Sequence, residues 1–312
     1  MKLKVGFIGV GAMGTPMVCN LIKAGYAVTI YDIRKEAMEA LALEGVEQAS
    51  SPKDVARQCP VVITMLPSSA EVEATVLGPD GVIEGVTPSS ILIDMSSSYT
   101  YSTRMLSKKL AEKGARMLDA PVSGGVRGAR EGTLAIMVGG DEKVLKECRS
   151  ILEAMGSKIT HVGNIGAGHA VKCLNNMCSA CTMIITSEAL VAATKLGLNP
   201  ELVLAAINNS SGRSYSSEYK FPTFVLNGAF NSGFTVSLMN KDVGMAVRLG
   251  EELHVPMFLG TIVQQVYNYA VAKGGSDMCH TSIVKFIEEC CGVKVRGQKY
   301  SKKKEVANHD RH

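Results

Sequence analysis

The chain has 312 residues, of which 46% are hydrophobic and 20% charged, with 31 Gly, 10 Pro and no Trp. This is the composition of a folded globular enzyme, and it excludes the disordered, collagenous and low-complexity classes. One hydrophobic core is near its practical limit at this length, so we expect two domains. Polar or charged residues interrupt every apolar stretch before the ~20 residues of a membrane span, so we predict no transmembrane helix.

The net charge of +4 is concentrated at the C-terminal end. Residues 294–312 contain seven Lys or Arg and two acidic residues, so the rest of the chain is close to neutral. A basic run of this kind could bind nucleic acid or an acidic membrane surface. We interpret it as a solvated, disordered tail, with neither nucleic acid nor membrane as a partner.

The nine cysteines are spread along the chain, and the first strand-like segment begins near Lys4, which leaves no room for a cleavable leader. An odd number of cysteines without a leader favours reduced thiols and a cytoplasmic protein. Cys178 and Cys181 have the spacing of a redox or metal site, but no second pair or suitable His accompanies them. We interpret them, like Cys290 and Cys291, as buried structural thiols, and we predict no metal.

Short runs rich in Val, Ile and Met alternate with helix-length segments in the first half of the chain. We predict strands over residues 4–10, 27–31, 61–66, 91–94, 116–119 and 134–138. Helical spacing fills the stretches between them, for example over residues 15–24, 35–43 and 103–113. This alternation predicts an α/β fold, a Rossmann-type doubly wound sheet that is mainly parallel and has helices on both faces.

From about Gly166 the pattern changes to long helical periods without a convincing strand. The predicted helices span residues 170–196, 200–208, 237–253, 257–273 and 282–290. We therefore expect a Rossmann domain over residues 1–165, an all-helical domain for substrate binding and oligomerisation over 166–293, and the basic tail over 294–312.

The most informative motif is G-x-G-x-x-G, directly after the first predicted strand and at the start of a helix. Gly9 permits the tight turn, Gly11 lets the backbone approach a pyrophosphate, and Gly14 lets helix and strand pack closely. We assign Ala12 and Met13, inside the motif, to the same cofactor site.

Asp32 closes the second predicted strand, about 20 residues beyond the motif, where an acid binds the ribose hydroxyls of NAD. A carboxylate repels the 2′-phosphate of NADP, so we predict NAD as the cofactor. Arg34 is the kind of residue that accommodates this phosphate, so NADP is the alternative.

Three further strand ends fit the same edge of the sheet. Leu66-Pro67 ends the third predicted strand and Ser97 follows the fourth. Carboxyl ends of parallel strands are where a doubly wound sheet binds its ligand, so we place these residues near the nicotinamide, with plain turns as the alternative. After the fifth predicted strand, Ser123-Gly124-Gly125 could form a backbone nest for a carboxylate or only a glycine-rich turn.

A second group of polar residues lies at the start of the long helical segment. Lys172 and Asn176 are four residues apart, so they share one helix face. The positive end of the helix dipole and partial desolvation favour the neutral form of a lysine here, which could exchange a proton with a substrate hydroxyl while Asn176 fixes the substrate. His169, three residues earlier, is the competing acid/base candidate, although exposed His residues are common at helix starts.

Together these segments resemble the β-hydroxyacid dehydrogenase family, and most closely its 3-hydroxyisobutyrate dehydrogenase branch, over about residues 4–293. The motifs that carry the resemblance occur in family order and are Gly6 to Gly14, Asp119 to Gly125, Gly168-x-x-x-Lys172-x-x-x-Asn176 and Lys241 to Gly244. The resemblance implies that Lys172 is the catalytic lysine and that Ser123, Gly124, Gly125 and Asn176 hold the substrate. It also implies that Lys241 reaches the nicotinamide and that the helical domain forms a homodimer or homotetramer. From the residues alone, Lys241-Asp242 would be a surface ion pair.

Two other segments bear on the resemblance. Residues 210–214 resemble a segment of the hydroxyisobutyrate and hydroxymethylglutarate dehydrogenases, in which Arg213 could pair bidentately with a substrate carboxylate or lie on the surface at a helix end. Glu71 departs from the family, whose members often have Asn there, and an acid at this position could weaken or alter cofactor contact.

We therefore predict reversible hydride transfer between NAD and a short β-hydroxy acid, which yields its semialdehyde, with Lys172 as the general acid/base. An alternative is tartronate semialdehyde reductase or another semialdehyde reductase of this family, against which residues 211–213 argue mildly. Imine-reducing relatives replace the catalytic lysine, so the presence of Lys172 argues against an imine reductase. A non-catalytic, nucleotide-sensing binding protein is the alternative from another class, favoured by the basic tail and disfavoured by Lys172.

Overall fold

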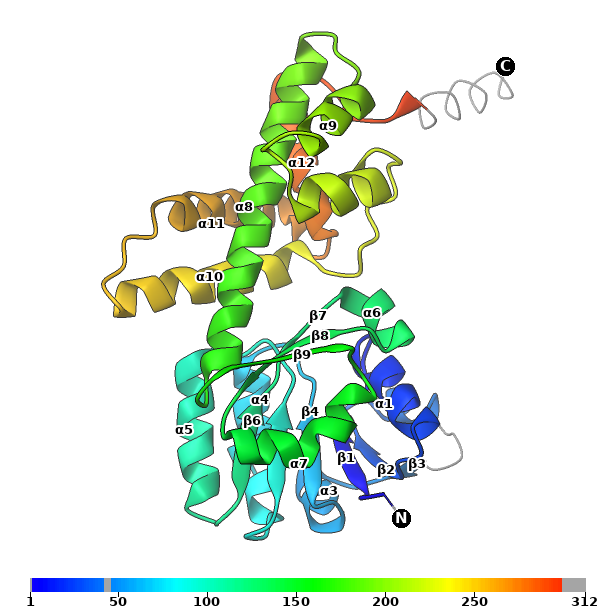
Figure 1. The fold of residues 1–312 in the computed structure, drawn as a ribbon, viewed down its shortest axis with the longest axis vertical. Coiled ribbons are helices and arrows are strands. Elements are labelled where there is room, and N and C mark those ends of the chain that lie inside the picture. Colours follow the sequence, from blue (N-terminus) through cyan, green and yellow to red (C-terminus); the bar gives the residue numbers. More distant parts are fainter. Residues whose placement is uncertain (1, 42–45, 299–312) are drawn as a thin grey trace. The chain divides into compact units, whose positions relative to one another are not determined.

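We describe residues 2–41 and 46–298 of the chain from a computed structural model. The chain forms two compact units that divide between Lys172 and Cys173. Figure 1 shows a sheet flanked by helices in the first unit and helices alone in the second. The helix α8 (Ala167–Lys195) begins in the first unit and continues into the second. The expected boundary after residue 165 lies just before this helix, whereas the compact units divide inside it.

The first unit contains a nine-stranded sheet in the order β3-β2-β1-β4-β5-β6-β8-β7, with β9 paired to β8. Five strands are mutually parallel and agree with the prediction: β1 (Val5–Ile8), β2 (Val28–Tyr31), β4 (Val61–Thr64), β5 (Ile91–Asp94) and β6 (Arg116–Asp119). The predicted strand β8 (Ala135–Gly139) is antiparallel to β6. The sequence does not predict β3 (Val46–Gln48), β7 (Val122–Ser123) or β9 (Lys158–Gly163), because the first two are very short and β9 is largely solvent-accessible.

Helices cover both faces of this sheet, and each face has its own hydrophobic core. One core takes residues from α1 (Gly14–Lys23), α2 (Lys35–Glu39), α6 (Gly125–Glu131) and α7 (Glu142–Glu153). The other takes residues from α3 (Pro52–Gln58), α4 (Ser69–Leu77), η1 (Val82–Glu84) and α5 (Thr100–Ala111). Phe7 of β1 packs into the first core and Ile8 into the second. Strands buried on both sides explain the continuous apolar runs of the sequence, and the Rossmann-type prediction is confirmed.

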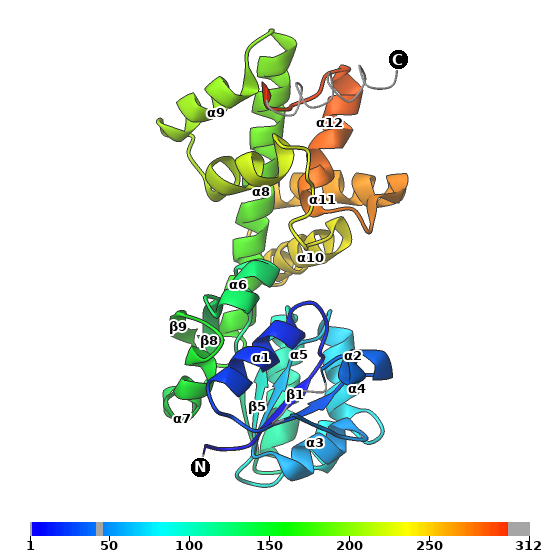
Figure 2. The same cartoon turned by 90° about the vertical axis from the view of Figure 1, so that its right-hand side faces the viewer.

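The second unit is built of helices around α8. They are α9 (Pro200–Asn208), the π-helix η2 (Ser216–Val225), α10 (Val236–Glu252), α11 (Phe258–Ala270), the π-helix η3 (Val271–Gly275), the short turn η4 (His280–Ser282) and α12 (Ile283–Cys291). In the view of Figure 2, α9 lies on one side of α8, and α11 and α12 lie on the other. The five long helices agree with the prediction. The helix η2 is not predicted, because Pro222 interrupts the helical pattern there.

The helix α8 bears on the expectation that the chain has no transmembrane helix. Over the residues that the structure describes, this one helix is long and apolar enough to cross a membrane by length and composition. Its residues Met183, Leu190 and Val191 are buried in the core of the second unit. A core helix meets the same length and composition criteria, so we interpret α8 as the central core helix of this unit.

The basic tail begins later than residue 294. Val295 is fully buried, and its neighbour Arg296 forms an ion pair with Glu288 at 2.6 Å. The Gln298 amide donates a hydrogen bond to Glu201 Oε2 at 3.1 Å. Residues 294–298 therefore pack on the second unit, and the predicted boundary after residue 293 is too early. The rest of the basic run, residues 299–312, lies outside the described residues.

The two cysteine pairs are less buried than the sequence predicts. Cys178 and Cys290 are exposed, while Cys181 and Cys291 are partly buried. Residues three apart on a helix share a face, and this face of α8 is partly open. All nine cysteines are free thiols. Within residues 2–41 and 46–298, no group of His, Cys, Asp and Glu is arranged to hold a metal ion.

Candidate active site

The glycine-rich turn between β1 and α1 is shaped by three glycines with different surroundings. Gly9 has a φ of 98°, and a Cβ there would overlap the carbonyl oxygen of Met65. A Cβ at Gly14 would overlap the Gly9 carbonyl oxygen, so helix and strand can approach only without it. At Gly11 the nearest atom to an added Cβ would be Nη2 of Arg34, at 3.5 Å, so this backbone is open to a ligand. Such a cradle fits the pyrophosphate of a dinucleotide.

Asp32, at the end of β2, is a buried carboxylate held by four donors. Its oxygens accept hydrogen bonds from the Val10 amide at 3.0 Å and from the Arg34 amide at 3.0 Å. The Arg34 side chain adds Nε at 3.1 Å and Nη2 at 3.2 Å. Burial alone would raise the pKa of Asp32, but the hydrogen bonds and charge of Arg34 outweigh it and hold the pKa below its usual value. Asp32 is therefore anionic at neutral pH, as a ligand of ribose hydroxyls should be.

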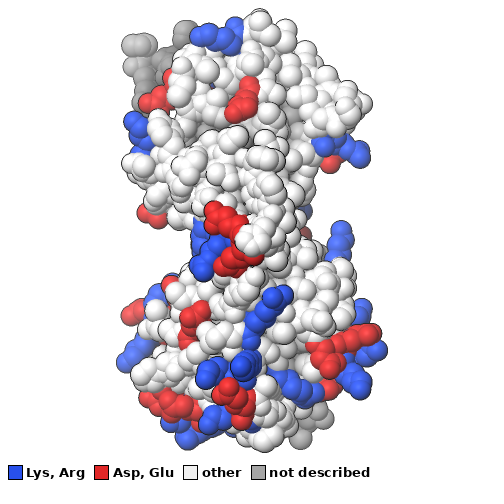
Figure 3. All heavy atoms as spheres, turned by 90° about the vertical axis from the view of Figure 1, so that its left-hand side faces the viewer, with Lys and Arg blue, Asp and Glu red and all other residues white. Residues whose placement is uncertain are grey.

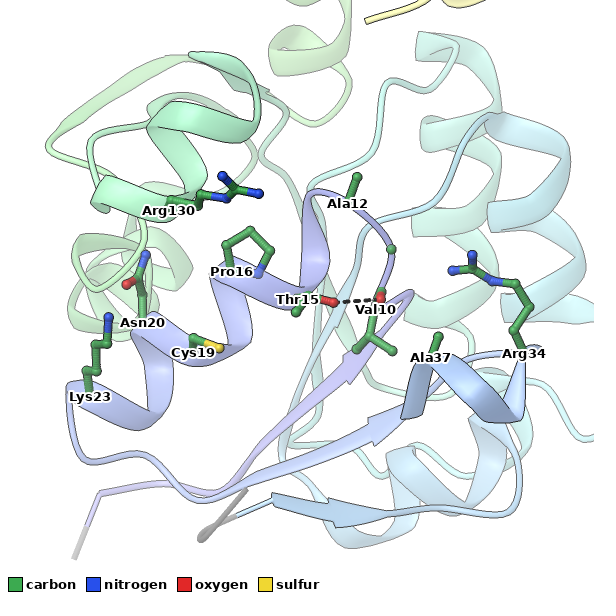
Figure 4. Close-up of a pocket in the computed structure, with 11 residues that line it drawn as sticks. Val10, Ala12, Thr15, Pro16, Cys19, Asn20, Lys23, Arg34, Ala37 and Arg130 are labelled. Carbon is green, nitrogen blue, oxygen red and sulfur yellow. Dashed lines mark hydrogen bonds between the residues drawn. The ribbon is translucent and has the colours of Figure 1, made fainter. Parts of the chain in front are cut away.

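A pocket of about 560 Å³ lies along this turn and the outer side of α1. Figure 4 shows Arg130 of α6 extending over α1, Lys23 at the far end of that helix and Arg34 on the opposite flank. The Thr15 hydroxyl donates to the Val10 carbonyl at 2.7 Å and closes the turn. A helix N-terminus with Arg34 beside it, and Arg130 and Lys23 further along the same pocket, favours a polyanionic ligand, which agrees with a dinucleotide.

His169 is buried within the first unit, so the expectation of an exposed His at the helix start is wrong. Its Nδ1 lies 2.7 Å from the Thr103 hydroxyl and its Nε2 lies 3.1 Å from the Ser96 carbonyl oxygen. The carboxylates of Asp94 and Asp119 lie 3.7 and 3.9 Å from the ring nitrogens. Both ring nitrogens thus have protein partners, and we interpret His169 as a residue that fixes the start of α8 on the sheet.

Asp119, at the end of β6, holds the same helix start. Its Oδ1 accepts a hydrogen bond from the Gly166 amide at 2.7 Å, and its Oδ2 accepts one from the His169 amide at 2.8 Å. A Cβ at Gly168 would overlap the carbonyl oxygen of Met137, so only glycine allows this approach. The segment before Lys172 is therefore built to fix the position of that lysine.

Replacing Asp119 with Ala is expected to lower the free energy of unfolding by about 3 kcal/mol, because two buried amides lose their acceptor. Since the chain has no Trp, urea unfolding followed by circular dichroism is the suitable measurement. Asp119→Asn keeps one acceptor oxygen and should lose less. Equal stability of the Ala variant and the wild type would contradict this role.

Lys172 and Asn176 are both buried on α8, one turn apart. The Asn176 side-chain amide donates to Asp242 Oδ2 at 2.5 Å, and Lys241 Nζ lies 3.1 Å from Asp242 Oδ1. Asp242 is fully buried, so it is no member of a surface ion pair. Apart from this ion pair, its Oδ1 makes no hydrogen bond within the described part of the chain and retains the capacity to accept one.

The three residues expected to form a backbone nest for a carboxylate occupy the turn between β7 and α6. Ser123 ends β7 and is half-buried, and the exposed Gly124 and Gly125 have φ values of 128° and 63°. These left-handed conformations favour glycine and leave the backbone accessible. Close approach of a carboxylate to these amides is therefore sterically feasible.

The remaining predicted residues differ in exposure. The Leu66 amide donates a hydrogen bond to the Ser96 hydroxyl at 2.9 Å, which joins the segments that follow β4 and β5. Pro67 is exposed and Ser97 is half-buried. Glu71 lies in the first turn of α4 and bonds with the Ser68 hydroxyl, so it stabilises that helix start. Arg213 is exposed and its Nε lies 3.5 Å from a Glu218 oxygen.

Comparisons with known proteins agree with this arrangement. Residues 4–163 match the family model of the NAD binding domain of 6-phosphogluconate dehydrogenase. Residues 166–287 match the model described as NAD-binding of NADP-dependent 3-hydroxyisobutyrate dehydrogenase. The chain is 40% identical to 2-(hydroxymethyl)glutarate dehydrogenase of Eubacterium barkeri, over 95% of this chain and 98% of the relative. It is 39% identical to human mitochondrial 3-hydroxyisobutyrate dehydrogenase, over 92% of this chain and 88% of the relative.

Solved structures show the same relationship. Mycobacterium tuberculosis 3-hydroxyisobutyrate dehydrogenase with L-serine has a TM-score of 0.85 and 34% identity, and the match covers 92% of this chain and 99% of that one. An imine reductase from Myxococcus stipitatus shares the fold alone, with a TM-score of 0.63 and 17% identity over 92% of this chain and 100% of that one. Fold and cofactor site thus define an oxidoreductase that uses NAD or NADP. The chain belongs to the β-hydroxyacid dehydrogenase family.

Three polar residues of the second unit receive no role in the site from the sequence. Asp242 belongs to the motif from Lys241 to Gly244, but beside Lys241 it has the pattern of a surface ion pair. Lys220 and His280 are both buried, although neither lies in a recognisable motif. The available signal for Lys220 is its position between the aromatic residues Tyr219 and Phe221, where a charged residue is unexpected.

Proposed function

We propose that the protein reversibly oxidises a short β-hydroxy acid of the 3-hydroxyisobutyrate type to its semialdehyde with NAD. The observation that carries this proposal is the buried pair Lys172 and Asn176 on one face of α8, with Asn176 held by Asp242. The names of the full-length relatives, which act on 3-hydroxyisobutyrate and 2-(hydroxymethyl)glutarate, support the substrate class.

In this mechanism Lys172 is the general acid/base. As a neutral amine it accepts the hydroxyl proton during oxidation, and as an ammonium it returns the proton during reduction and stabilises the developing negative charge on oxygen. Asn176 orients the hydroxyl, and Ser123, Gly124 and Gly125 bind the carboxylate through a hydroxyl and backbone amides. Arg213 is a further proposed carboxylate ligand, which would first have to leave Glu218.

The residues proposed to hold the cofactor are Gly9, Gly11, Ala12, Met13, Gly14, Asp32, Leu66, Pro67, Ser97 and Lys241. When bound, the nicotinamide supplies the hydride acceptor. Anionic Asp32 favours the ribose hydroxyls of NAD over the 2′-phosphate of NADP. Arg34 stabilises this carboxylate in the structure, and it would have to turn away from Asp32 to accept a phosphate.

The experiment that tests this function follows absorbance at 340 nm with NAD and NADP. The panel contains 3-hydroxyisobutyrate, 2-(hydroxymethyl)glutarate, glycerate, and tartronate and methylmalonate semialdehydes. NAD-linked oxidation of a β-hydroxy acid is the expected result. Preferred reduction of tartronate semialdehyde would favour the reductase alternative, and cofactor binding without turnover of any compound would favour a non-catalytic binding protein.

We further propose a cytoplasmic homodimer or homotetramer. The nine free thiols fit a reducing compartment. The second unit exposes large apolar side chains from the end of α10 through α11, among them Leu253, Phe258, Leu259 and Ile262. Figure 3 shows one face of the molecule on which this unit carries few charged side chains. Exposed apolar surface of this kind indicates a protein interface.

Replacing Phe258, which is 78% exposed, with Asp is expected to shift the oligomer to a smaller species. Light scattering coupled to size-exclusion chromatography measures the mass directly. Lys273→Asp, also on this unit but outside this group of apolar residues, is the control. An unchanged mass of the Phe258 variant would place the interface elsewhere.

A further inference from the structure

A buried lysine in the second unit has no part in the mechanism above. Lys220 lies on η2 and is only 6% exposed, and its Nζ donates a hydrogen bond to the Ser179 hydroxyl at 2.7 Å. The same Nζ lies 6.0 Å from the centre of the Tyr215 ring. Tyr215 itself is exposed, so Lys220 lies just below the surface of the unit. Burying an ammonium costs free energy, which makes such a lysine a candidate for ligand recognition.

Ser179 connects Lys220 to the proposed catalytic face of α8. Lys172, Asn176 and Ser179 have the spacing i, i+4, i+7, so their side chains leave the helix on one face. Ser179 follows Asn176 by roughly 4.5 Å along the helix axis. Because Lys220 Nζ is hydrogen-bonded to Ser179, its ammonium lies about one turn of α8 beyond Asn176, the residue proposed to orient the substrate.

The surroundings of Lys220 are polar and suit a carboxylate. Ser216, also on η2, lies with its hydroxyl 2.9 Å from the Thr182 hydroxyl of α8. His280 belongs to η4, which packs against η2. Burial, and then the charge of Lys220, lower the pKa of His280 well below its usual value, so the imidazole is neutral. Its Nδ1 is buried and makes no hydrogen bond within the described ranges, so a ligand oxygen could satisfy it.

We infer that Lys220 binds a second carboxylate of the substrate, so that the enzyme prefers a β-hydroxy dicarboxylate to a β-hydroxy monocarboxylate. This inference rests on the proposed function, because it places the reacting hydroxyl at Lys172 and Asn176. A substrate with two methylene groups before its second carboxylate has a length comparable with the separation of Asn176 and Ser179 along α8. The sequence-based candidate for a carboxylate, Arg213, is instead exposed and close to Glu218.

The test compares 2-(hydroxymethyl)glutarate with 3-hydroxyisobutyrate as dicarboxylate and monocarboxylate probes. Calorimetric titration into the full-length protein loaded with NADH measures binding without turnover, and NAD-linked kinetics measure KM and kcat. Lys220→Met should raise Kd and KM for the dicarboxylate by roughly 10- to 100-fold, because a charge-assisted hydrogen bond is lost. Values for the monocarboxylate should change by less than about threefold. Lys220→Arg should retain most of the preference, and Lys195→Met, the same change at an exposed position of α8, should have no effect.

Several results would overturn the inference. They are a wild-type protein without preference for the dicarboxylate, an equal loss for both probes in Lys220→Met, and loss of the preference in Arg213→Met instead. If Lys220→Met does not fold, Ser179→Ala removes the hydroxyl that holds the ammonium and must lower the preference by roughly fivefold. A Lys220-dependent preference in the titrations without turnover of either probe would support this binding site and overturn the proposed reaction.

Discussion

Replacing Lys172 with Ala is expected to lower kcat for oxidation of the β-hydroxy acid by roughly 10²- to 10⁴-fold, the usual contribution of a general acid/base. The Kd for NAD should stay the same, because the proposed cofactor contacts come mainly from the glycine-rich turn and Asp32. Steady-state kinetics with saturating NAD and fluorescence titration of NADH measure the two quantities separately.

Lys195→Ala on the same helix is the matched control and should retain full turnover, since this exposed lysine bonds to the Cys291 carbonyl oxygen. His169→Gln separates the two acid/base candidates. Because His169 fixes the start of α8, this variant should have a lower free energy of unfolding but should retain proton transfer. Near-wild-type turnover of Lys172→Ala would show that another group transfers the proton.

Replacing Asp32 with Ala is expected to raise the KM for NAD by roughly 10- to 100-fold, because the ribose hydroxyls lose a charged acceptor. The same change releases the Arg34 side chain from two hydrogen bonds with this carboxylate, so that it can pair with the 2′-phosphate of NADP. The ratio of kcat/KM for NAD to that for NADP should therefore fall. Measuring this ratio for both cofactors with one substrate checks the prediction.

The double variant Asp32→Ala/Arg34→Ala is the control for the second effect. It should lose the affinity for NAD without gaining affinity for NADP, because no guanidinium is present at position 34 to bind the phosphate. An unchanged cofactor ratio in Asp32→Ala would mean that neither residue selects the cofactor.

The fold could be predicted from the sequence largely because its central strands are buried on both faces. Runs such as Val61–Thr64 and Ile91–Asp94 are mostly apolar, which identifies them without any knowledge of their partners. The strand β9 (Lys158–Gly163) has no such pattern, because an accessible strand leaves no continuous apolar run. The helix η2 contains Pro222, which local propensity treats as a helix breaker.

The candidate site could be predicted only where spacing along the chain reports on chemistry. The turn from Gly9 to Gly14, Asp32 and the pair Lys172 and Asn176 have such spacing. The burial of His169 depends on Thr103 and Ser96, which are distant in sequence, so its role required the fold. The same holds for Lys220, whose partner Ser179 lies on another helix.

The central claim is hydride transfer from the carbon that bears the β-hydroxyl group to NAD. The most direct measurement is oxidation of 3-hydroxyisobutyrate or 2-(hydroxymethyl)glutarate in which both hydrogens on that carbon are replaced by deuterium, followed by mass analysis of the reduced cofactor. We predict one deuterium per NADH formed by the wild type and little product from Lys172→Ala. Reduced cofactor without deuterium, or no reduction of NAD or NADP by either labelled acid, would contradict the account.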